Sequence, residues 1–166
     1  MNLFGWKGIN IDASAESISR FNRCREHDEN IFAAVTDING TVNLYKSDQL
    51  GEVNTLSDKH RRKWQDKGVN YKVTSVPSKR LEDILDDIMP ESQQIHFMNI
   101  DVEDAEMGVL KSNNWEKYRP KVIAIELHGL DESKPETDEI AAKLMDCNYQ
   151  LQKYISPTGI FIDTLQ

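Results

Sequence analysis

A largely apolar run that leads directly into acidic residues is the feature that most constrains this chain. Residues 95–100 form the run, and four acidic side chains follow within residues 101–106, where a helical pattern begins. Such runs are typical of buried strands in a parallel sheet. Ligands of open α/β sheets bind just beyond the carboxyl ends of such strands. We therefore expect Asp101, Glu103 and Glu106 to stand at a cleft, although a helix N-terminus also favours acidic residues.

Strand-like and helix-like patterns alternate along the whole chain. This alternation predicts an α/β fold with a mostly parallel sheet, in one domain over residues 1–166. Ser14 and Pro90 mark the start of one expected helix and the end of another. The expected strands are 6–12, 31–36, 41–45, 71–76, 95–101, 122–128, 149–155 and 160–163, and the expected helices are 14–26, 55–67, 81–88, 105–111 and a segment from Thr137 through Met145.

Turn-forming residues predict how some of these strands connect. Asp37-Ile38-Asn39-Gly40 predicts a hairpin between the strand that ends at Thr36 and the strand that begins at Thr41. Pro77-Ser78 predicts a turn after the following strand. Ser156-Pro157-Thr158-Gly159 predicts an antiparallel hairpin at the C-terminus, which would make the sheet mixed.

Composition excludes several classes of function. The chain has 166 residues and a formal charge of −8, which argues against nucleic acid or an anionic membrane as the main partner. The basic cluster at 59–63 is expected to be a solvated helix face. Cys24 and Cys147 are isolated and lack the spacing of a zinc site or disulfide framework. No apolar run suggests a membrane span or a signal peptide, so we expect a cytoplasmic protein.

Several segments, taken in order, resemble the FkbM-type methyltransferases, a branch of the Rossmann-like enzymes that use S-adenosylmethionine. Together they cover roughly residues 5–130. The resemblance implies a mostly parallel sheet with a C-terminal antiparallel hairpin, and methyl transfer to an oxygen of a small-molecule or sugar-like acceptor. The matching segments are residues 5–14, 33–37, 54–57, 81–85, 100–106 and 119–126.

The resemblance also implies roles for individual residues. Asp12 matches the acid that holds the two ribose hydroxyls of the methyl donor, and one carboxylate can accept from both hydroxyls. Asp37 is expected to help bind the donor. A general base would ease deprotonation of a hydroxyl acceptor. Asp101 is the first choice for this base, and Glu126 and His128, at the end of the next strand, are the alternates.

Two alternatives stay open at this stage. Asp101, Glu103, Glu126 and His128 could hold a divalent cation if their strand ends adjoin, although we expect no metal site. The chain could also be a non-catalytic remnant or interaction module that keeps a methyltransferase scaffold, because fold alone does not establish activity.

The family pattern begins with a strand and a glycine-rich loop that we do not find. No two of the eight glycines form a G-x-G motif. The ribose acid of related folds lies about 20 residues after that loop, and this distance from Asp12 reaches beyond Met1. We therefore expect a shortened fold that lacks the first strand and helix. Unpaired strand edges would then favour direct pairing, a borrowed strand or a homodimer. Asp104 also departs from the family, which usually has glycine there.

Overall fold

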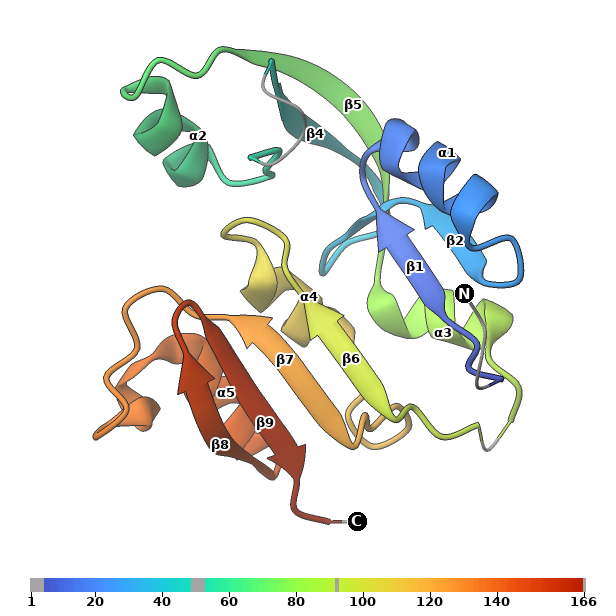
Figure 1. Ribbon diagram of the computed structural model, residues 1–166, viewed down its shortest axis with the longest axis vertical. Helices are drawn as coiled ribbons and strands as arrows, with labels where there is room; N and C mark the ends of the chain where they lie inside the picture. The colour runs from blue at the N-terminus through green and yellow to red at the C-terminus, as the bar shows by residue number, and fades with distance from the viewer. Residues whose placement is uncertain (1–4, 49–52, 92, 166) are drawn as a thin grey trace. The chain divides into compact units, whose positions relative to one another are not determined.

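The structure is a computed structural model that describes residues 5–48, 53–91 and 93–165 (Figure 1). Its contacts divide the chain between Arg80 and Leu81 into two compact units. We call them the N-terminal unit and the C-terminal unit and describe each by itself. The single domain expected over residues 1–166 stays a prediction.

The N-terminal unit begins with a strand–helix–strand segment. Strand β1 (Ile9–Asp12) pairs in parallel with β2 (Glu29–Phe32), and helix α1 (Ala15–Cys24) connects them. The Ser14 hydroxyl accepts a hydrogen bond from the Ser17 backbone N–H at 3.3 Å. This bond satisfies one of the free amides of the first helical turn and confirms the predicted helix start.

A second sheet of the N-terminal unit contains β3 (Ala34–Val35), β4 (Gly40–Ser47) and β5 (Tyr71–Lys79), in the order β3-β5-β4. The predicted hairpin at residues 37–40 is wrong, because β5 lies between the two strands that the turn connects. All eight residues of β4 pair with β5, and this pairing outweighs the local turn preference. The connection instead passes the end of β5, where the Ser78 hydroxyl donates to the Ile38 carbonyl at 2.6 Å.

The predicted turn at Pro77-Ser78 is also wrong, because β5 continues through Pro77 to Lys79. Strand β3 pairs with Ser78 and Lys79, so β4 is the only partner of β5 at Pro77 among the strands of the described residues. A proline is tolerated at such an open edge because it has no N–H to donate. Helix α2 (Asp58–Gln65) follows β4 and starts later than predicted, at the N-cap Ser57.

The C-terminal unit contains a four-stranded mixed sheet in the order β6-β7-β9-β8 (Figure 1). Strands β6 and β7 are parallel, and the other two pairs are antiparallel. The last two strands form the predicted terminal hairpin. Helices and strands alternate along the chain, which makes it an α/β protein. The mostly parallel sheet that was expected is not observed, because the described strands form three separate sheets in which antiparallel pairs are as frequent as parallel ones. The elements are α3 (Leu81–Ile88), β6 (Phe97–Ile100), α4 (Glu106–Ser112), β7 (Val122–Glu126), the short 3₁₀ helix η1 (Pro135–Thr137), α5 (Glu139–Asp146), β8 (Tyr149–Ile155) and β9 (Thr158–Asp163).

A buried ion pair supports the base of this sheet. Arg119 donates to both carboxylate oxygens of Asp163, at 2.6 and 3.1 Å. The side chains are 15% and 1% exposed. Arg119 also donates to the carbonyls of Trp115 and Cys147, and its guanidinium lies 5.0 Å from the ring centre of Tyr149. These partners lie in the C-terminal unit, so this side chain connects the loop before β7 with β8 and β9.

Candidate active site

The carboxyl ends of β6 and β7 bring two of the predicted catalytic carboxylates to one edge of a sheet. Ile100 and Ile125 are register partners in the parallel pair, and Asp101 and Glu126 follow them directly. Asp101 is exposed, whereas the side chain of Glu126 is only 16% exposed. This edge of an α/β sheet is where ligands bind.

The third predicted catalytic residue, His128, contacts Glu126. Its Nε2 lies 3.3 Å from Glu126 Oε1. Glu126 is the last residue of β7 and His128 lies in the turn that follows. Leu127 between them is buried in the core. The imidazole is 50% exposed, so it can meet a ligand while the carboxylate is largely shielded from water.

Two hydrogen bonds from the C-terminal hairpin fix the backbone between these residues. The N–H of Leu127 donates to the Pro157 carbonyl at 2.6 Å, and the Tyr154 hydroxyl donates to the Leu127 carbonyl at 2.8 Å. Gly129 follows with a φ of +79°, a conformation that glycine adopts without strain. Glu126 and His128 thus flank a residue whose backbone is held by two hydrogen bonds. The contributions of Pro157 and Tyr154 were not predicted, because nothing local in the sequence links the hairpin to β7.

Glu106 was expected at a cleft, but it is 4% exposed and turns inward. Its Oε1 accepts a hydrogen bond from the Val102 N–H at 3.2 Å. Burial raises the pKa of the Glu106 carboxyl; backbone amides oppose this shift and the negative charge of Glu126 adds to it. The buried Glu106 side chain therefore stabilises the loop between β6 and α4 through its hydrogen bond with the Val102 backbone.

That loop has two residues in the left-handed region. Glu103 has a φ of +56° and Asp104 a φ of +75°. Glycine adopts this conformation freely, whereas other residues pay a steric cost. Asp104 therefore has a backbone conformation that favours glycine, the residue that the resemblance led us to expect at this position.

Asp12 lies at the carboxyl end of β1 and already has a structural task. Its Oδ1 accepts a hydrogen bond from the Ser14 N–H at 2.7 Å, which fixes the approach to α1. A carboxylate has further lone pairs, so this bond leaves room for another donor. Asp12 and Asp101 belong to different units.

Asp37, the second residue predicted to bind the donor, is exposed in the connection from β3 to β4. Its backbone carbonyl accepts a hydrogen bond from the Arg80 guanidinium at 3.1 Å. This contact involves the main chain and leaves the predicted role of its carboxylate untested.

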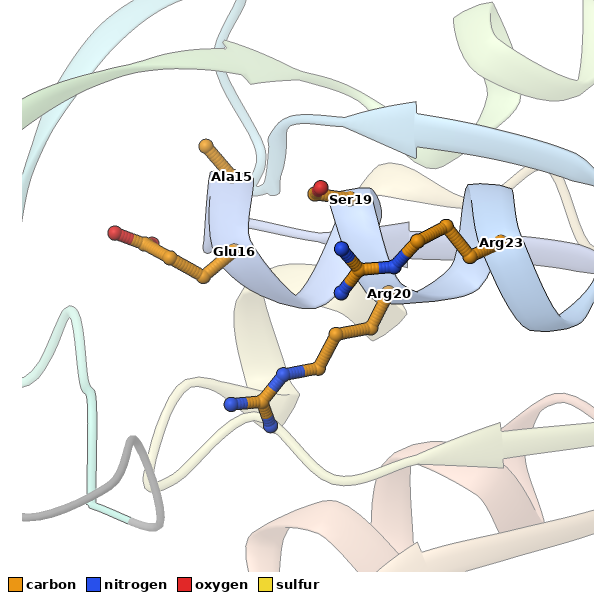
Figure 2. Close-up of a pocket in the computed structure, with 5 residues that line it drawn as sticks. All are labelled: Ala15, Glu16, Ser19, Arg20 and Arg23. Atoms are coloured by element: carbon orange, nitrogen blue, oxygen red, sulfur yellow. The ribbon is translucent and has the colours of Figure 1, made fainter.

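A shallow pocket runs along the exposed side of α1 (Figure 2). It includes none of the predicted site residues. Glu16 at one end forms an ion pair with Lys46, and the hydrogen bond from Lys46 lowers the pKa of Glu16 to about 2. The lining residues are Ala15, Glu16, Ser19, Arg20 and Arg23.

Neither a metal-binding cluster nor a membrane-spanning helix is found in the part of the chain that the structure describes. No group of three or more His, Cys, Asp or Glu side chains in this part is arranged to hold a metal ion. None of its helices has the length and apolar character needed to cross a membrane.

A comparison with protein families gives one match, which spans nearly the whole chain. The model of the methyltransferase FkbM domain matches residues 2–151, and this range includes every predicted site residue. No curated protein and no solved structure matches the chain significantly. The extent of the family match is sufficient for an assignment: the chain belongs to the FkbM methyltransferase domain family.

Proposed function

We propose that this protein is an S-adenosylmethionine-dependent methyltransferase that acts on a hydroxyl oxygen of a small-molecule or sugar-like acceptor. The observation that carries the proposal is the end of β6 and β7, where Asp101, Glu126 and His128 gather on one anchored edge in a chain of a methyltransferase family. Fold alone would not support an activity, because function depends on the site.

The proposal assigns a role to each predicted residue. Asp12 accepts hydrogen bonds from the donor ribose with the lone pairs that Ser14 leaves available. Asp37 contributes to the same donor site. S-adenosylmethionine supplies an electrophilic methyl group, so the chain itself has to position the acceptor and take up its proton. Asp101 is the base expected from the sequence, with Glu126 and His128 as the alternates.

We further propose a Rossmann-like methyltransferase sheet without the family's first strand and helix. The parallel β1–β2 and β6–β7 pairs and the antiparallel hairpin of β8 and β9 support this proposal. The 166 residues contain no G-x-G motif. Binding of the donor is therefore the first property to measure.

Isothermal titration with S-adenosylmethionine and its demethylated product tests the proposal. We expect micromolar binding by the wild type and a loss of at least tenfold in Asp12→Asn, which keeps an oxygen acceptor for the Ser14 N–H. Asp101→Asn is the matched control, because it removes a carboxylate predicted to act on the acceptor and should bind the donor normally. Absence of heat at millimolar ligand would refute the proposal.

A non-catalytic interaction module is the second candidate function, and the lack of a G-x-G motif favours it. Its partner would be a second copy of the chain, joined through exposed strand edges. A monomer by light scattering at high protein concentration would count against that partner. Methyl transfer by the purified chain would exclude the non-catalytic reading.

A further inference from the structure

We propose that Glu126 positions His128, and that His128 Nδ1 is the atom that accepts the proton of the acceptor hydroxyl. This inference rests on the proposed function and refines its choice of base from Asp101 to His128. Glu126 acts through the imidazole and is a positioning residue. The Glu126 carboxylate and the His128 ring together are called the Glu–His pair below.

The first argument concerns the tautomer of the imidazole. Glu126 Oε1 faces His128 Nε2 at 3.3 Å. An ionised carboxylate only accepts hydrogen bonds, so the nitrogen that faces it is the one that bears the proton. The lone pair of the neutral ring is then on Nδ1. An imidazole held in this way is a general base with a defined direction.

The second argument concerns exposure. Glu126 Oε2 is buried, and the Glu126 side chain is 16% exposed, whereas His128 is half exposed. Glu126, which would orient the imidazole, is thus shielded from water, and His128, which would accept the proton, is accessible to a ligand. Asp101 is also exposed, but histidine is the side-chain type that titrates nearest neutral pH, which suits proton transfer better.

The third argument is the anchored backbone. Hydrogen bonds from Leu127 to Pro157 and from Tyr154 to Leu127 hold the residue between the members of the pair. A general base must lie within hydrogen-bond distance of the hydroxyl that it deprotonates, and a backbone held in place favours this geometry.

Charged groups from the neighbouring elements also act on the pair. Glu106 from α4 interacts electrostatically with Glu126, and burial raises the pKa of Glu106. A neutral Glu106 would leave the negative charge on Glu126, where it can hold the His128 N–H. Asp101 lies at the same sheet edge, directly after the register partner of Ile125. Tyr154 from β8 donates its hydroxyl hydrogen to the Leu127 carbonyl.

The resulting step is balanced in atoms and charge. The acceptor oxygen gives its proton to His128 Nδ1 and forms a bond to the methyl carbon. The carbon–sulfur bond of the sulfonium breaks, and its electron pair stays on sulfur as a neutral thioether. The imidazolium that forms beside Glu126 later releases the proton to water.

Nitrogen NMR of ¹⁵N-histidine-labelled protein tests the Glu–His pair without any ligand. We expect the neutral His128 ring to carry its proton on Nε2 in the wild type. In Glu126→Leu, which has no acceptor, the share of this tautomer should fall and the Nδ1–H form should become detectable. Asp101→Asn is the control and should leave the tautomer unchanged. A neutral wild-type ring with its proton on Nδ1, or an unchanged tautomer in a folded Glu126→Leu variant, would overturn the inference.

Methyl transfer provides the second readout. Formation of S-adenosylhomocysteine, followed with a panel of small hydroxyl compounds, should fall at least 100-fold in His128→Gln and about tenfold in Glu126→Gln, but less than tenfold in Asp101→Asn. A larger loss in Asp101→Asn than in His128→Gln would refute His128 as the base. Normal tautomer behaviour in a chain that binds no S-adenosylmethionine would support the pair and reject the proposed function, so the two failures can be told apart.

Discussion

Strands β1 and β6 are similar in sequence but end in different surroundings. Each has four residues, each leads into an acidic residue at its carboxyl end, and each is followed by a helix. Asp12 at the end of β1 turns its carboxylate back to the Ser14 N–H. Asp101 after β6 is exposed, and the buried carboxylate of that loop comes from Glu106.

The parallel neighbour accounts for much of the difference. Strand β2 ends at Phe32 and offers no acid or histidine beside Asp12, whereas β7 ends in Glu126 with His128 two residues later. Equivalent strand ends can therefore have different surroundings, because β7 brings the contact between Glu126 and His128 to the same sheet edge as Asp101. The four predictions that follow test this contrast, from the largest expected effect to the smallest.

Removal of the Asp163 carboxylate should disrupt the scaffold that carries the Glu–His pair. Asp163→Leu leaves the buried Arg119 guanidinium without its ion-pair partner, and the expected loss in free energy of unfolding is about 3–5 kcal/mol. Chemical denaturation measures this loss. Lys117→Ala is the control: it removes an ion pair to Asp86 whose members are both about half exposed, so its effect should be far smaller. Equal losses in both variants would contradict the role of Arg119 and Asp163.

The two acids at the strand ends should differ in their contributions to stability. Asp12→Ala removes the acceptor of the Ser14 N–H and should cost about 1.5 kcal/mol. Asp101→Ala changes an exposed side chain and should stay within about 0.5 kcal/mol of the wild type. Denaturant unfolding of both variants checks this. A larger loss for Asp101→Ala would reverse the comparison.

Glu106 should make the stability of the protein depend on pH in a defined direction. Burial raises the pKa of Glu106 in the folded state, so the unfolded chain loses this proton first as the pH rises. The folded state then binds more protons between the two pKa values, and the stability that Glu106 contributes decreases with rising pH across that interval. Glu106→Gln should lack this decrease. Denaturation midpoints from pH 4 to pH 8 would show it, and identical pH profiles would contradict the burial of an ionisable group.

Asp104→Gly should stabilise the loop between β6 and α4. Asp104 has a φ of +75°, where glycine avoids the steric cost, and the gain should be about 0.5–1 kcal/mol after the entropy cost of glycine. Asp66→Gly is the matched control, because Asp66 has a φ of −63° at the end of α2. There the same substitution should destabilise by about 0.5–1 kcal/mol. Thermal unfolding of both variants shows whether each is more or less stable than the wild type.

Local patterns predicted the helices well. Ser14 accepts a hydrogen bond from the first turn of α1, and the apolar stripe from Leu81 to Ile88 forms α3. These features depend on neighbours in the chain, so the sequence contains the information needed to find them. The C-terminal hairpin was also predicted, because its turn and both strands are contiguous.

Strand pairing between distant segments was predicted less well. Asp37-Ile38-Asn39-Gly40 has the chemistry of a hairpin turn, yet β5 separates the strands on either side. Pro77 predicts the end of a strand, but β5 continues through it because β3 pairs with β5 at Ser78 and Lys79 and not at Pro77. Both errors arise because a turn preference is a small local free energy, whereas pairing along β4 and β5 is a larger sum over many contacts.

The sequence by itself determined that Asp12, Asp101 and Glu126 lie at the ends of strands, because each follows an apolar run of consecutive residues. His128 was expected in the same strand as Glu126 but lies in the turn after it. Tertiary structure decided what those side chains do there. It placed β7 beside β6, turned Glu106 inward, and anchored Leu127 so that Glu126 meets His128 at 3.3 Å. The reason is that a strand end is encoded locally, while its surroundings depend on contacts between residues distant in the chain.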